Sequence, residues 1–392
     1  MAAGHSVDPG LWLGMLDELM LRIGGRFRRV EPRRRARAFI LGLLAGLPRK
    51  NCWTIAEHVG DDSPGGMQHL LSRASWDADG VRDDLRAYVI EHLGDPQAAL
   101  VVDETGDVKK GTATAGVQRQ YTGTAGRVEN AQVAVYLSYA APGGHALIDR
   151  ELYLPRSWAG DQERCAAAGI PDGTLFATKP ALATRMIGRA LDAGTPAAWV
   201  TGDEVYGGDP GLRASLERRQ IGYVLAVAKS HTVATGAGPV RAGALAAKLP
   251  PGSWQRLSAG AGAKGQRWYD WAWVAIEPGR LGYPWLLIRR NRHTRELAFY
   301  RCWSPRQVPL PTLVRVAGIR WSTEENIAAG KGPGRAGRAP GPYLDLLAPV
   351  GDFGHACPGL PHRGRRGRAR PAPTARADPA HPQRDRPPCR GP

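Results

Sequence analysis

Two aspartates in this chain each follow a short apolar segment. Asp103 comes directly after residues 98–102, and Asp203 comes after residues 197–202. A short apolar run bounded by turn residues predicts a strand that is buried on both faces. Two carboxylates at neighbouring strand ends could share a divalent cation, because hard cations prefer oxygen ligands. Either Asp alone also fits a residue that caps a turn, so the metal hypothesis depends on a third acid.

The composition indicates a globular protein with a polyanionic partner. The 392 residues are 43% apolar and carry a formal net charge of +17, which favours nucleic acid over a membrane surface. The apolar stretch 38–47 is too short to span a bilayer, and the first residues lack the pattern of a signal peptide. The scattered cysteines indicate neither a disulfide framework nor a zinc site. We therefore expect a cytoplasmic, nucleoid-associated protein with no membrane partner.

Residues 1–95 have helical spacing and are predicted to form a helical N-terminal DNA-binding domain. Small helices with basic clusters are compatible with a helix-turn-helix-like unit. A solvated basic face on a helical bundle is the alternative. The arginines that concentrate charge here are Arg22, Arg26, Arg28, Arg29, Arg33, Arg34, Arg35 and Arg37.

From about residue 96 the pattern changes to an α/β order. Three successive strands, a helix, a strand, a helix and a strand are expected up to residue 228. This order resembles a ribonuclease-H-like sheet, in which the first and fourth strands lie side by side, so Asp103 and Asp203 would be neighbours. Residues 232–310 contain Gly/Ala-rich loops and then strand-like segments, of which 266–274 alternates polar and apolar side chains, and they are predicted to be a β-rich insertion. The catalytic domain would span residues 96–331.

A third acid, Glu324, lies in a basic and polar segment near residue 320. Ser322 or Thr323 could begin a helix there, with glutamates favoured in its first turn. Arg320, Glu324 and Lys331 are spaced four and seven apart, so on a continuing helix they share one face. The carboxylate could ligate a metal while the cations hold phosphates. The alternative is an ordinary surface ion pair, which contributes little.

These residues resemble the signature of DDE transposases of bacterial insertion sequences, Tyr-x-x-Arg-x-x-x-Glu-x-x-x-x-x-x-Lys. Arg320, Glu324 and Lys331 occupy the last three positions, and Ala317 replaces the Tyr. The first and second acids look like Asp103 and Asp203. Further resemblance lies in residues 116–121, 127–133, 151–155 and 177–180.

The resemblance implies that Asp103, Asp203 and Glu324 hold two Mg²⁺ (or Mn²⁺) ions. Such a site cleaves double-stranded DNA at transposon ends and joins the freed 3′-OH to target DNA, with a homodimer as the assembly in the synaptic complex. Glu104, Glu204 and Glu325 are expected to point elsewhere. The residues expected to contact phosphates, if they line the cleft, are Arg320, Lys331, Lys109, Lys110, Arg119 and Lys229.

Residues 332–392 lose helical periodicity and are rich in Pro, Gly and Arg. They fit a disordered basic tail, and we favour the hypothesis that they are translated out of frame. Family members continue with apolar helices at this point, so the chain is expected to be weakly active or inactive. Two other functions stay open: a structure-selective endonuclease on the same fold, and a non-catalytic DNA-binding relic or regulator of transposition.

Overall fold

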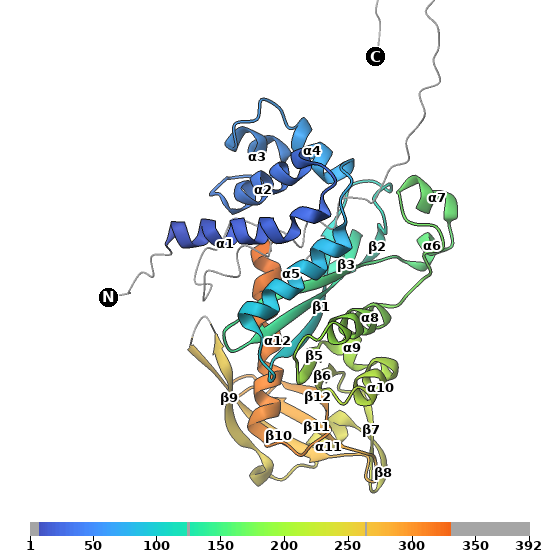
Figure 1. Ribbon diagram of the computed structural model, residues 1–392. Helices are drawn as coiled ribbons and strands as arrows, with labels where there is room; N and C mark the ends of the chain where they lie inside the picture. Colours follow the sequence, from blue (N-terminus) through green and yellow to red (C-terminus); the bar gives the residue numbers. More distant parts are fainter. Residues whose placement is uncertain (1–7, 124–125, 263–264, 331–392) are drawn as a thin grey trace, which may run out of the picture. The chain divides into compact units, whose positions relative to one another are not determined.

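The computed structural model describes residues 8–123, 126–262 and 265–330, with the backbone alone at residue 9 and residues 321–330. Lys331 and the predicted tail therefore lie outside the described residues. The class expected from the sequence is confirmed: helices come first, and a large mixed sheet follows (Figure 1).

Three of the five helices in the helical region, α1, α3 and α5, begin at a residue whose side chain caps the helix. Asn51 accepts hydrogen bonds from the backbone N–H groups of Trp53 and Thr54, and Asp77 accepts one from Gly80. Such caps satisfy N–H groups that a helix start leaves unpaired. The helices are α1 (Pro9–Arg22), α2 (Val30–Leu44), α3 (Cys52–His58), α4 (Gly65–Ser72) and α5 (Ala78–Leu93), with a 3₁₀ turn η1 (Ile23–Arg26).

Within the described residues, the main sheet contains ten strands. Its centre is parallel: β1 (Ala99–Val108) pairs with β5 (Trp199–Gly202), which pairs with β6 (Gly222–Val227). One flank is antiparallel to β6 and runs β12 (Leu297–Ser304), β11 (Tyr283–Arg290), β10 (Gly265–Ala275) and β9 (Gln255–Gly262). On the other flank β3 (Arg127–Ala141) pairs with β1, and its far edge carries β2 (Gln118–Thr122) and β4 (Gly144–Tyr153).

Helices cover both faces of the central strands, as the alternation of side chains requires. Leu100 and Val102 pack in a core with α8 (Lys179–Asp192) and α10 (Pro210–Arg218). Ala99 packs on the opposite face with α12 (Leu310–Gly330). Odd-numbered residues of β1 therefore face α12, and even-numbered residues face α8.

Two expectations about the elements are corrected. β1 continues to Val108, so Asp103 lies within this strand and not at its end. α12 begins at Leu310 instead of Ser322 or Thr323, because Leu313 and its neighbours at helical spacing form an apolar face that is buried against the sheet. The predicted β-rich segment is present, and its strands extend the main sheet, since β12 pairs with β6. This segment also contains the hairpin β7 (Thr232–Thr235) and β8 (Gly238–Arg241), the helix α11 (Ala242–Ala247) and the 3₁₀ turn η2 (Pro251–Ser253).

Some short elements escape sequence reasoning. Strand β2 is polar, and the helices α6 (Arg156–Ala159) and α7 (Gln162–Ala167) are too brief to show a period. The division into domains at residues 95 and 331 stays a prediction.

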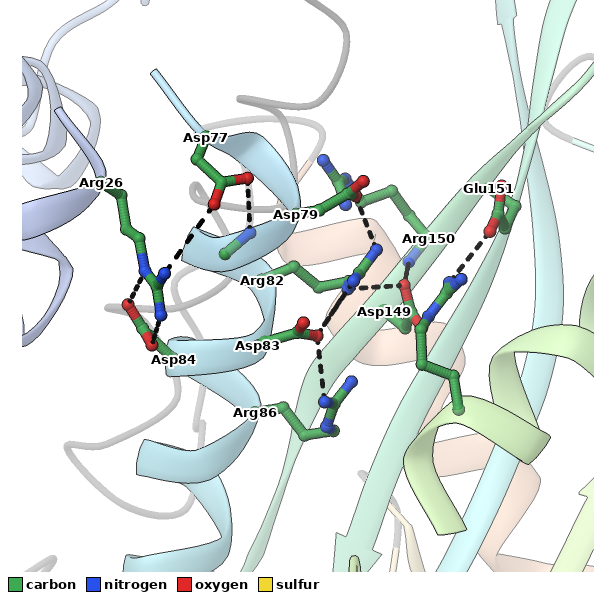
Figure 2. A network of polar contacts seen from close by, with 12 residues as sticks. Arg26, Asp77, Asp79, Arg82, Asp83, Asp84, Arg86, Asp149, Arg150 and Glu151 are labelled. Carbon is green, nitrogen blue, oxygen red and sulfur yellow. Dashed lines mark hydrogen bonds and ion pairs between the residues drawn. The ribbon is translucent and has the colours of Figure 1, made fainter. Parts of the chain in front are cut away.

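An ion-pair network joins the helical region to the sheet (Figure 2). The Asp149 side chain on β4 is fully buried, and its Oδ2 lies 2.7 Å from Arg189 Nη2 of α8. Its Oδ1 lies 3.7 Å from Arg82 Nε of α5. Arg82 also contacts Asp79, whose side chain is 77% exposed. The buried carboxylate thus connects β4 to two helices.

We expect Asp149→Ala to destabilise the fold by roughly 3 kcal/mol, because it leaves two arginines facing an empty buried position. Asp79→Ala removes a carboxylate from the same Arg82 at the surface and should cost less than about 1 kcal/mol. Urea unfolding of both variants measures the difference. Equal destabilisation by the two substitutions would contradict this account of the network.

Candidate active site

Three carboxylates meet where the parallel pairing of β1 and β5 ends. Oxygen atoms of Asp103, Glu104 and Asp203 all lie within 4.8 Å of one another. The register of the two strands ends at Val102 paired with Gly202, so the next residues of both strands lie at the same edge. We call these three residues the acidic cluster. The expected proximity of Asp103 and Asp203 is thus present in the fold.

The expectation that Glu104 points elsewhere is wrong. Glu104 does face α8, opposite to Asp103, as strand alternation demands. However, β5 ends at Gly202, so beyond Val102 the β5 edge of β1 is no longer covered by a strand. Carboxylates from both faces of β1 can therefore approach one another around the end of β5.

Asp203 caps a helix as well as belonging to the acidic cluster. It directly precedes α9 (Glu204–Gly207), and its Oδ1 accepts a 2.9 Å hydrogen bond from the Val205 backbone N–H. α9 lies tightly against β6: a Cβ at Gly207 would stand 1.8 Å from the Ala226 carbonyl oxygen. Asp203 can therefore cap a turn and also belong to a cation site, the two functions considered from the sequence. The hydrogen bond to Val205 fixes its position.

Cations flank the acidic cluster on the two faces of the sheet. Arg320 Nη1 of α12 lies 3.9 Å from Asp103 Oδ2. On the other face, Lys179 Nζ at the start of α8 lies 2.8 Å from Glu104 Oε1. The buried Tyr206 of α9 donates a 2.6 Å hydrogen bond to Glu104 Oε2. Both oxygens of Glu104 therefore have partners.

Besides Glu104, sequence reasoning did not assign Lys179 and Tyr206 to the site. Lys179 belongs to the segment 177–180, which carries part of the family resemblance, and Tyr206 follows Asp203 by three positions. These two positions in the sequence were the signal that could have pointed to both residues. Neither residue type marks a metal site by itself, and their contacts depend on where α8 and α9 begin.

The backbone of Glu324 lies in α12 one turn after Arg320, but its side chain is not among the described residues. Lys331 lies outside the described residues as well. The structure thus brings Asp103, Asp203 and Arg320 together. The role of Glu324 as the third acid stays a prediction.

The remaining predicted phosphate contacts lie farther along the sheet. Lys109 and Lys110 follow β1 and stand about 20 Å from Asp103 along an extended chain. Arg119 is exposed on β2 and pairs with Asn130, six positions along β3 from the partner of Asp103. Lys229 is exposed two residues beyond β6, at the same sheet edge as Asp203. Among these four, Lys229 has the placement most consistent with a contact near the acidic cluster.

A close backbone contact holds α12 against the sheet. A Cβ at Gly318 would stand 2.0 Å from the Ala259 carbonyl oxygen of β9. Arg267 Nη2 donates to the carbonyls of both Ala259 and Gly318, at 2.8 and 3.1 Å. This contact lies two residues before Arg320, so it determines where Arg320 and the backbone of Glu324 lie.

Burial shifts the titration of both aspartates upward. It raises the pKa of Asp103 to about 6, against the hydrogen bond from the Glu104 backbone N–H and the charge of Arg320. Burial also raises the pKa of Asp203, and the charge of Glu104 adds to that rise. Grouped carboxylates with raised pKa values are typical of functional sites.

These shifts predict opposite pH effects on the metal-free and metal-bound protein. Because the folded pKa of Asp103 exceeds the unfolded value of about 3.9, the metal-free protein should lose stability as pH rises from about 4 to about 6. A cation binds the carboxylate form, so its stabilising effect should grow over the same rise. Thermal unfolding in EDTA and in Mn²⁺ at several pH values measures both. A Mn²⁺ effect of equal size at pH 5 and pH 8 would contradict this prediction.

The acidic cluster fits a hard divalent cation. All its donors are carboxylate oxygens, which is the ligand type that Mg²⁺ and Mn²⁺ prefer, whereas softer metals favour imidazole or thiolate. Among the residues that the structure describes, the three carboxylates have only two positively charged side chains beside them, Lys179 and Arg320. A bound metal ion could balance the remaining negative charge. The residues present therefore suit the cofactor that the fold implies.

Comparison with known proteins identifies the family of this chain. The model of the DDE superfamily endonucleases matches residues 24–274, and this chain belongs to that family. A segment of 194 residues is 31% identical to a probable transposase for insertion sequence element IS701 from Microchaete diplosiphon. It covers 49% of this chain and 48% of that protein, so the match spans about half the length of the relative. The resemblance inferred from the sequence is confirmed. Among the described residues, no helix has the length and apolar character needed to cross a membrane.

Proposed function

We propose that this chain is a metal-dependent transposase that cleaves the ends of an insertion sequence and joins the 3′-OH to target DNA. The observation that carries the proposal is the acidic cluster, formed by three carboxylates at the edge of a ribonuclease-H-like sheet in a DDE superfamily endonuclease. The name of the IS701 relative supports transposition over other uses of the fold.

Asp103 and Asp203 would hold the cations, with Glu324 as the third ligand from α12. Two divalent ions bound in such a site lower the pKa of an attacking water and stabilise the leaving oxygen of a phosphodiester. Arg320 stands beside Asp103 and would orient a DNA phosphate at the same edge. Lys229 would contact the DNA backbone farther out.

DNA binding would draw on the arginines of the helical region that remain exposed. Arg28, Arg29 and Arg34 are exposed on and before α2. Arg22 and Arg26, by contrast, form ion pairs with Glu91 and Asp84 of α5. The basic cluster predicted from the sequence is therefore partly structural, and the exposed arginines are our candidates for phosphate contacts.

The test is an assay of the full chain on DNA carrying the inverted-repeat ends of the element, with Mg²⁺ or Mn²⁺. End cleavage followed by strand transfer supports the proposal. Cleavage without transfer would instead favour a structure-selective nuclease. DNA binding without any cleavage, in a folded protein that binds Mn²⁺, would favour a relic or regulator. Robust cleavage would refute the separate proposal that the segment after Lys331 leaves the chain weakly active.

A further inference from the structure

Glu104 differs from the two aspartates beside it, because both of its oxygens are already held by the protein. Lys179 Nζ stands 2.8 Å from Oε1, and the Tyr206 hydroxyl donates to Oε2 at 2.6 Å. The side chains of Glu104 and Lys179 are 18% and 21% exposed. Glu104 therefore lies at the acidic cluster in a fixed orientation, with each of its oxygens already bound to a partner in the protein.

Its charge still acts on the neighbouring carboxylates. A Glu104 oxygen lies within 4.8 Å of oxygens of both Asp103 and Asp203. At this distance, in a partly buried site, one charge changes the local potential strongly. Glu104 thus makes the site more attractive to a cation, while Lys179 opposes that effect.

The pair also ties together the elements that carry the site. Glu104 belongs to β1, Lys179 is the first residue of α8, and Tyr206 lies in α9, the helix that Asp203 caps. Tyr206 is fully buried, and α9 lies tightly against β6 at Gly207. The ion pair between Glu104 and Lys179 is therefore held in one position, next to the two aspartates, by β1, α8 and α9.

We infer that Glu104 and Lys179 form a charge-setting pair of the cation site: Glu104 strengthens cation binding from the outer shell, and Lys179 weakens it. Glu104 is thus a positioning residue that acts on the cation through space and through the two aspartates. The inference rests on the proposed function, since it assumes a cation at Asp103 and Asp203.

The test is titration of the full chain with Mn²⁺, followed by electron paramagnetic resonance or calorimetry at pH 7.5. Glu104→Gln should weaken Mn²⁺ binding by roughly tenfold or more, as outer-shell changes commonly do. Lys179→Met should tighten it several-fold, and the double variant should return to within about threefold of the wild type. A purely structural pair would instead give weaker binding in both single variants.

Glu204→Gln is the matched control, because it makes the same change of charge at the exposed glutamate after Asp203. It should leave Mn²⁺ affinity within about twofold. Wild-type affinity in a folded Glu104→Gln variant, or weaker binding in Lys179→Met, would overturn the inference. If Asp103→Asn also left Mn²⁺ affinity unchanged, the proposed cation site itself would fail, and the two failures would be distinguishable.

Discussion

Replacing Asp103 by Asn is expected to abolish catalysis and to stabilise the metal-free protein. Asp103 is a half-buried carboxylate whose pKa is raised to about 6, so at pH 7.5 its charge destabilises the fold by on the order of 2–3 kcal/mol. Asn keeps the shape without that charge. Loss of a ligand that supports several kcal/mol of transition-state stabilisation should lower cleavage at least about 10³-fold.

Thermal unfolding in EDTA measures the first effect, and cleavage of end-sequence DNA measures the second. The stabilisation by Mn²⁺ should also disappear, which remains measurable even if the wild type cleaves slowly. Glu204→Gln serves as the control and should change none of the three properties. A variant that unfolds at a lower temperature than the wild type in EDTA would show that Asp103 has a structural role.

Gly318→Ala should be a strongly damaging single-methyl substitution near the site. The new Cβ would stand 2.0 Å from the Ala259 carbonyl oxygen, and a backbone atom cannot rotate away. We expect α12 to shift from β9 and the fold to lose about 2–4 kcal/mol, although Ala favours helix over Gly by about 1 kcal/mol. Since Arg320 follows two residues later, cleavage should fall as well.

Gly14→Ala is the matched control for this substitution. Gly14 is exposed within α1, and a Cβ there meets nothing within 4 Å, so the change should stabilise the protein by about 0.5–1 kcal/mol. Urea unfolding of both variants gives the comparison. If Gly318→Ala were as stable as Gly14→Ala, the close contact between α12 and β9 would not hold the helix in place.

Much of the architecture was predictable because strong local patterns coincide with the fold. The apolar runs before Asp103 and Asp203 do form neighbouring parallel strands, and the order of strands and helices was sufficient to place them together. The alternating segment around Trp271 forms β10. These elements have apolar periods that are long enough to recognise.

The errors arise where tertiary contacts override local pattern. Alternation correctly places Glu104 on the opposite face from Asp103, but the end of β5 allows both into one cluster. The start of α12 was misplaced because capping residues at Ser322 and Thr323 lie inside a longer apolar helix. β2 is polar and is stabilised by its pairing with β3, which no local signal reveals.

The central claim is that Asp103 and Asp203 bind a divalent cation at the sheet edge. Anomalous diffraction from crystals of the full chain grown with Mn²⁺ tests it most directly. We predict an anomalous peak roughly 2.0–2.6 Å from a carboxylate oxygen of each aspartate, with Glu104 still bound by Lys179 and Tyr206. Well-ordered aspartates without a peak, or Mn²⁺ bound only elsewhere, would contradict the claim.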